Sequence, residues 1–171
     1  MAQLSARNDV LTQSTAPSGW HRVASQRPEN RERASVQEYF DRFADAMTSG
    51  NTKAMAKLWG VPAFVLGKTE ARVVQSEDEV EQFFSGSKET YNEWGITHTQ
   101  AEITSLDWVD SDLVVATVRW PYLDDQDEVL GEESSSYTLF RGEDGSFKLR
   151  SVLMRGGSAQ PRETKDGTDG E

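Results

Sequence analysis

The 171-residue chain contains no cysteine, which excludes disulfide bonds, thiolate metal sites and cysteine nucleophiles. It has only two histidines, too few for a zinc site built on imidazole and thiolate ligands. No run approaches the roughly 20 apolar residues of a membrane span, and no basic-then-apolar leader opens the chain, so we expect a cytoplasmic protein without membrane contact. Glycine-rich phosphate loops are missing as well, and we expect no cofactor.

Basic residues are also in short supply, with 18 Lys and Arg against 29 Asp and Glu and a net charge of -11. A nucleic-acid backbone requires a basic face, so nucleic acid is excluded as the main partner. Four acidic residues crowd one loop, Asp124, Asp125, Asp127 and Glu128. Counted from either of the first two, the loop lacks the glycine and the final glutamate of a calcium-binding EF-hand. We therefore expect a solvated hairpin tip and no metal site.

Composition divides the chain into three parts. Residues 1–34 and 156–171 contain few large apolar side chains, and both are predicted to be disordered tails because they cannot bury enough surface to offset their ordering entropy. Residues 35–155 are long enough to bury one core and form the predicted domain.

The domain is predicted to open with helices. Ser35 and Glu38 form a capping box, and apolar residues then recur at helical spacing until Gly50, which provides the left-handed stop. Asn51 is placed to cap a short second helix. A third helix is predicted over 76–94, opened by a second capping box and carrying Gly86, a candidate break.

Strands make up the rest of the prediction. A small hairpin joins residues 63–66 to 72–74, and after Gly95 the apolar period changes to two. Four strands are expected at about 96–108, 113–120, 132–141 and 146–154. Short turns between consecutive strands make them antiparallel neighbours. Three helices packed on one face of a curved antiparallel sheet bury both sets of apolar faces, which predicts an α+β fold.

Several segments in this order resemble the nuclear transport factor 2-like (NTF2-like) superfamily, which includes SnoaL-like polyketide cyclases, ketosteroid isomerases, limonene epoxide hydrolases and scytalone dehydratases. The segments are 39–51, 58–65, 76–84, 112–116 and 145–149. The resemblance covers 35–155. It implies a cone-shaped, strongly curved sheet wrapped around three N-terminal helices, with a pocket at the wide end. It also implies a homodimer that pairs through the outer face of the sheet.

The resemblance allows a test of isomerase chemistry. Ketosteroid isomerases use a helix tyrosine and an acid as oxyanion donors and an aspartate as base. Phe43 stands at the position of the helix tyrosine, Tyr137 near that of the donor acid, and Gly67 at that of the base. Neither Phe43 nor Gly67 can move a proton, so the isomerase mechanism of this family is excluded.

Other enzymes of the superfamily rely on histidine and acids. His98 is the one imidazole of the domain, and as a general base it needs an orienting acid, for which Glu102 and Asp107 are candidates on the same predicted strand. The alternative is a half-exposed strand histidine without catalytic role.

Arg119 lies in an otherwise apolar run and is a candidate electrophile for a substrate carboxylate or enolate. The alternative is a position on the outer face, paired with Glu133 or Ser135 across the hairpin. Glu132 and Glu133 are adjacent in a strand and therefore face opposite sides, so one of the two is solvated.

Aromatic residues suggest a binding pocket. The superfamily geometry implies that Phe43, Trp59 and Tyr137 face inward, with Met154 as a flexible wall and Tyr39 nearby. The favoured hypothesis is a domain that binds a small apolar molecule. One alternative is a SnoaL-like cyclase, dehydratase or hydrolase that uses His98 with an acid. Another is a protein–protein adaptor that uses the sheet face and the first tail. Catalysis stays open.

Overall fold

The computed structural model describes residues 21–157, and their side chains from residue 30 on. Residues 1–20 and 158–171, which hold most of both predicted tails, lie outside the described residues. The chain divides into two units, residues 1–32 and 33–171. The sheet, the candidate site and all helical residues from Arg33 on belong to the second unit.

Two helices open the described part, a pair of strands and two further helices follow, and the remaining five strands come last. The helices are α1 (His21–Ser49), α2 (Thr52–Leu58), α3 (Glu77–Phe84) and α4 (Ser87–Glu93). The strands are β1 (Trp59–Leu66), β2 (Ala71–Val74), β3 (His98–Thr99), β4 (Glu102–Trp108), β5 (Leu113–Leu123), β6 (Val129–Arg141) and β7 (Phe147–Gly157). None of the helices within residues 21–157 combines the length and the apolar character that a bilayer span requires.

The predicted helix ends are confirmed at three places. The side chain of Asn51 accepts a hydrogen bond of 3.0 Å from the amide of Ala54, which caps α2. Ser76 accepts from the amide of Glu79 at 3.2 Å and caps α3. Gly86 takes the left-handed conformation with φ +85° and separates α3 from α4, so the predicted third helix is two helices.

The predicted start of the first helix is wrong. Helix α1 begins at His21 and passes through Ser35, which is therefore a helical residue and no N-cap. The segment before Ser35 is rich in Arg, Glu, Gln and Ala, which are strong helix formers. This propensity extends the helix beyond the capping signature, and residues 21–34 do not belong to a disordered tail.

The sheet is mixed, with the strand order β2-β1-β7-β6-β5-β3, and β4 also pairs with β5. All described pairs are antiparallel except β1 and β7, which run parallel. The expectation of a purely antiparallel sheet is wrong at this pair, because no hairpin turn fixes the relative direction of strands from opposite ends of the domain. The strand expected over 96–108 is split into β3 and β4.

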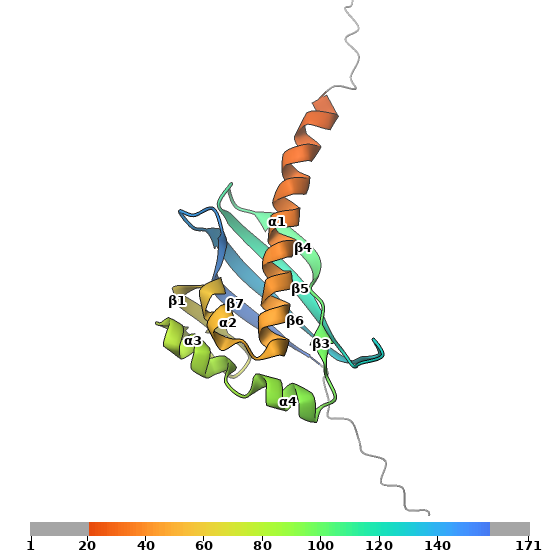
Figure 1. Cartoon of the computed structure of the whole chain (residues 1–171). Coiled ribbons are helices and arrows are strands. Elements are labelled where there is room, and N and C mark those ends of the chain that lie inside the picture. Colours follow the sequence, from red (N-terminus) through yellow and green to blue (C-terminus); the bar gives the residue numbers. More distant parts are fainter. Residues whose placement is uncertain (1–20, 158–171) are drawn as a thin grey trace, which may run out of the picture. The chain divides into compact units, whose positions relative to one another are not determined.

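The core lies between the sheet and the helices. In β5 every second residue points inward, and Val114, Ala116, Val118 and Trp120 are all fully buried. They meet an apolar stripe of α1 that includes Phe40. Figure 1 shows this part of α1 lying across one face of the bent sheet. The α+β architecture with helices before a curved, open sheet is thus confirmed.

Candidate functional site

A cavity of about 190 Å³ lies between the inner face of the sheet and the helices. Its wall is mostly aromatic and aliphatic, with side chains contributed by α1, α3, α4, β1, β6 and β7. The lining residues are Phe43, Met47, Trp59, Val65, Phe83, Phe84, Tyr91, Glu133, Ser135, Tyr137, Val152 and Met154. A wall of this kind suits a small molecule with an apolar body and few polar groups.

Four of the five residues predicted to bind a ligand line this cavity, namely Phe43, Trp59, Tyr137 and Met154. The fifth, Tyr39, is a core residue instead: it is fully buried, and its hydroxyl donates to the carbonyl oxygen of Leu58 at 3.0 Å. That hydroxyl is therefore already used within the fold. Ligand binding by the other four stays a prediction.

A wider recess of about 460 Å³ adjoins the cavity and shares Phe83, Tyr91 and Glu133 with it. The recess adds two aromatic side chains, Trp94 and Tyr122, and the hydroxyls of Ser85, Ser87 and Thr90. The shared residues stand where the two spaces meet. The site therefore combines an apolar cavity with a more polar, aromatic entrance.

Glu133 faces this site because of its strand register. It lies directly opposite Trp120 on β5, whereas Glu132 lies opposite Pro121. Residues paired across two strands share a face of the sheet, and Trp120 points into the core. The period of two in a strand predicts that Glu132 and Glu133 face opposite sides, but it does not decide which one faces inward. The strand register decides this, because Glu133 pairs with Trp120, one of the inward-facing apolar residues of β5.

Tyrosines surround the Glu133 carboxylate. Tyr122 makes a side-chain hydrogen bond with Glu133, and its hydroxyl also meets that of Tyr91. Burial, followed by the nearby charge of Glu133, raises the pKa of Tyr91 to about 12. The same two causes raise the pKa of Tyr137. Burial also raises the pKa of Tyr122. These phenols therefore stay neutral at physiological pH and keep a proton to donate.

Trp59 lines the cavity and carries an unused hydrogen-bond donor. Its indole Nε1 is buried and has no hydrogen-bond partner among the described residues. The other core indole in this region behaves differently, because Nε1 of Trp120 donates to the hydroxyl of Tyr137 at 2.9 Å. A buried donor without an acceptor is unusual, since such groups are nearly always paired.

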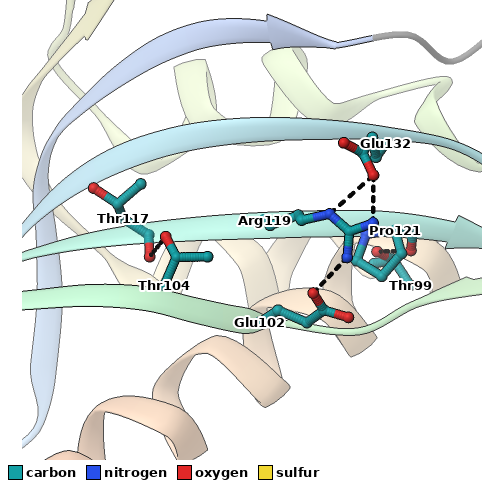
Figure 2. A network of polar contacts seen from close by, with 7 residues as sticks. All are labelled: Thr99, Glu102, Thr104, Thr117, Arg119, Pro121 and Glu132. Carbon is teal, nitrogen blue, oxygen red and sulfur yellow. Dashed lines mark hydrogen bonds and ion pairs between the residues drawn. The ribbon is translucent and has the colours of Figure 1, made fainter.

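Arg119 lines neither the cavity nor the recess, so its predicted role as an electrophile in the pocket gains no support. Its guanidinium lies between two carboxylates on the outer face of the sheet, with Nη1 2.6 Å from Glu102 and Nε 2.9 Å from Glu132 (Figure 2). Hydrogen bonds to Glu132 and then to Glu102 raise the pKa of Arg119. The outer-face alternative is confirmed, although the partner across the hairpin is Glu132 and neither Glu133 nor Ser135.

Strand β5, which carries Arg119, also accepts hydrogen bonds from two neutral hydroxyls. Thr99 donates to the carbonyl oxygen of Pro121 at 2.7 Å, and Thr104 donates to that of Thr117 at 3.1 Å (Figure 2). Both hydroxyls bind backbone carbonyls within the sheet, so they hold β3 and β4 against β5.

His98 has an acidic partner, but not one of the predicted acids. Its Nε2 lies 3.0 Å from a carboxylate oxygen of Asp127, and its Nδ1 lies 2.9 Å from the hydroxyl of Thr97. The regular strand that would align His98 with Glu102 does not form, because β3 ends at Thr99. His98 lines neither the cavity nor the recess. The structure therefore gives no support to a role of His98 on a molecule held there, and the role stays a prediction.

The acidic loop after β5 holds a turn in place. Asp124 is buried, and one of its carboxylate oxygens accepts hydrogen bonds of 2.9 Å from the amides of Gln126 and Glu128. Asp124 therefore departs from the predicted solvated tip, because it is buried and holds the turn. Across the described residues, no group of three or more histidine and acidic side chains is placed to hold a metal ion.

A family model described as "NTF2-like protein (DUF6841)" matches residues 31–157. The chain belongs to this family. The match includes every strand of the sheet and all of the residues that line the cavity and the recess. No protein of established function matches the sequence.

Solved structures share the NTF2-like fold at low sequence identity. An NTF2-like protein with a cystatin-like fold from Novosphingobium aromaticivorans is 12% identical, with a TM-score of 0.59 over 81% of this chain and 90% of the other. A domain of unknown function from Nostoc punctiforme is 16% identical, with a TM-score of 0.55 over 72% and 76%. At such identities the similarity establishes the fold and no activity.

A ketosteroid isomerase-like protein from Erwinia carotovora also shares the NTF2-like fold, at 14% identity and a TM-score of 0.55 over 73% of this chain and 95% of the other. The residues of this chain differ from the isomerase pattern. Phe43 and Tyr137 line the cavity, and Phe43 has no proton to transfer. The one carboxylate in the lining is Glu133 on β6, far in sequence from Gly67, where the resemblance places the base.

Proposed function

We propose that the cavity binds a small, mainly apolar molecule that carries a hydrogen-bond acceptor. The observation that supports this function best is the buried, unpartnered indole Nε1 of Trp59 in the cavity wall. Leaving a buried donor unsatisfied costs about 1–3 kcal/mol. A ligand acceptor at this position would remove that cost.

The shape and composition of the cavity support a compact ligand. Its volume of about 190 Å³ is below the roughly 300–1,000 Å³ of pockets for drug-sized molecules. Met47 and Met154 form part of the wall, and their flexible side chains can adapt to different ligand shapes. The ligand is therefore expected to be smaller than a typical drug molecule.

Native mass spectrometry of the purified full chain, compared with its denatured mass, tests for a retained ligand. Calorimetric titration with benzyl alcohol, which has an apolar ring and an oxygen acceptor, tests the site directly. We expect Trp59→Phe to weaken this binding about five- to tenfold, since the donor is lost. Trp108→Phe, on β4 beside Phe147, is the matched control and should bind as the unmodified chain does. A ligand-free mass together with no titratable binding would contradict the proposal.

The enzyme alternative loses the residues on which it was based, because His98 and Arg119 both lie away from the cavity. The adaptor alternative depended partly on the first tail, of which residues 1–20 lie outside the described part. Neither alternative gains support from a specific contact.

A second copy of the chain is the proposed partner of the outer sheet face. Four large apolar side chains are between 42% and 47% exposed on β1, β2 and β7, namely Phe64, Leu66, Val73 and Leu153. Strand pairing places Phe64 opposite Val73 and Leu66 opposite Leu153, so they share one face. Such a contiguous apolar cluster is typical of an interaction surface, and the superfamily resemblance points to a homodimer.

Light scattering coupled to size-exclusion chromatography tests this partner. We expect twice the monomer mass for the full chain, and a shift to monomer when Phe64→Ser and Leu153→Ser are combined. Val129→Ser removes a more exposed apolar side chain at the start of β6 and should leave the mass unchanged. A monomer at about 100 µM would contradict the dimer.

A further inference from the structure

Glu133 is a charged side chain without a cationic partner. Its neighbour Glu132 forms an ion pair with Arg119, but no ion pair in residues 33–157 includes Glu133. Glu133 is half-buried, and its described hydrogen-bond partner is the neutral hydroxyl of Tyr122. Shielded charges are normally paired, because their removal from water is costly.

The charges around Glu133 favour a cationic ligand over an anionic one. Neither the cavity nor the recess has a lysine, arginine or histidine in its lining, and Glu133 is the single charged residue of both. An anionic ligand would meet a negative charge and no compensating one. A cationic ligand would supply the partner that Glu133 lacks.

Aromatic rings stand on the same side as the carboxylate. Tyr91, Trp94 and Tyr122 line the recess together with Glu133, and the rings of Tyr91 and Tyr122 lie 5.6 Å apart between centroids. The negative faces of aromatic rings attract organic cations, and ammonium groups are recognised in proteins by such rings. The raised pKa values of the tyrosines keep these rings neutral.

We propose that the cavity and recess together bind a compact organic ammonium ion, with its charged head at Glu133 among the recess aromatics and its apolar portion in the cavity. This inference rests on the proposed function and narrows its ligand class. The ammonium head pairs with Glu133, while Tyr122 holds the carboxylate from the other side.

Three probes of similar size and different charge test the proposal in calorimetric titrations of the full chain: benzyltrimethylammonium, benzyl alcohol and benzoate. We expect the cation to bind about tenfold more tightly than the alcohol, and benzoate to bind least. Glu133→Gln should reduce the preference for the cation to within about twofold. Glu132→Gln makes the same change one residue away on the opposite face and should keep the full preference.

A salt titration of the unmodified chain gives the same answer without any variant. Raising the salt concentration from about 0.02 to 0.5 M should weaken binding of the cation and leave that of benzyl alcohol nearly constant. If benzyl alcohol binds and the cation binds no more tightly, the ammonium proposal is overturned while the proposed function stands. Retention of the preference in folded Glu133→Gln overturns it as well. If none of the three probes binds, both proposals fail.

Discussion

The two faces of the sheet carry polar groups that differ in whether the fold gives them a partner. On the outer face, Arg119 is held between Glu102 and Glu132, and each charge has its partner within the fold. On the inner face, Glu133 has no cation, and the indole of Trp59 has no acceptor among the described residues. A polar network satisfied by its own members stabilises the sheet. Polar groups that the fold leaves unsatisfied beside a cavity are the ones available to a ligand.

The largest expected effect is on stability, in a comparison of two buried tryptophans, one with a hydrogen-bond partner and one without a described partner. Trp120→Phe removes a donor that binds Tyr137 and leaves a void, which should lower the free energy of unfolding by about 2–4 kcal/mol. Trp59→Phe removes the same atoms, but its donor has no described partner and its ring borders a cavity. We expect this loss to be at most about half as large. Urea denaturation measures both, and equal losses would mean that the Trp59 donor is satisfied in the folded protein.

Alkaline pH should destabilise the inner face. Tyr91 has a pKa near 12 in the folded protein, against an ordinary value of 10.0. Between these values the unfolded chain has lost the proton while the folded chain still holds it, so the stability that is complete below pH 10 falls as pH rises. One such group gives a slope of about 1.4 kcal/mol per pH unit. Urea denaturation between about pH 9 and 11 measures the slope. Tyr91→Phe should reduce it by this one-group amount, while Tyr122 and Tyr137, whose pKa values are also raised, keep the remainder. An unchanged slope in this variant would contradict the assignment.

Adjacent glutamates should respond differently to neutralisation. Glu133→Gln removes a half-buried charge that has no ion-pair partner among the described residues and keeps an oxygen for Tyr122, so it should leave the free energy of unfolding unchanged or raise it slightly. Glu132→Gln breaks an ion pair and should lower it slightly. Thermal unfolding of the two variants side by side checks the signs. Destabilisation by Glu133→Gln would indicate that Glu133 already has a cationic partner.

The smallest effect is expected from Arg119→Gln. The ion pairs of Arg119 are solvent-exposed, so its loss should lower Tm by at most about 2 °C at low salt and by less at high salt. Probe binding in the cavity should not change. Scanning calorimetry and the titrations described above measure both quantities. A clear change in binding would show that the outer network influences the inner cavity.

Local patterns in the sequence predicted the local structure well. The caps at Asn51 and Ser76 and the break at Gly86 follow from side-chain chemistry within a few residues, and the alternation of β5 follows from period two. The superfamily resemblance placed Phe43, Trp59, Tyr137 and Met154 near one space, and these residues line the cavity.

What the sequence could not decide depends on contacts between distant segments. Period two separates Glu132 from Glu133, but only the register of β6 against β5 determines which one faces inward. The same register places Arg119 outside. The parallel pairing of β1 with β7 also joins segments from opposite ends of the domain. The start of α1 was missed for another reason, because helix propensity outweighed a matching capping signature at Ser35.

The most direct test is a two-dimensional NMR titration of the indole N–H signals of the full chain with benzyltrimethylammonium. Single Trp→Phe variants assign the signals. We predict that the Trp59 and Trp94 signals move on titration, because these residues line the cavity and the recess, while the Trp108 signal stays in place. Movement confined to Trp108, or no movement of any indole signal at saturating probe, would contradict the assignment of the inner face as the binding site.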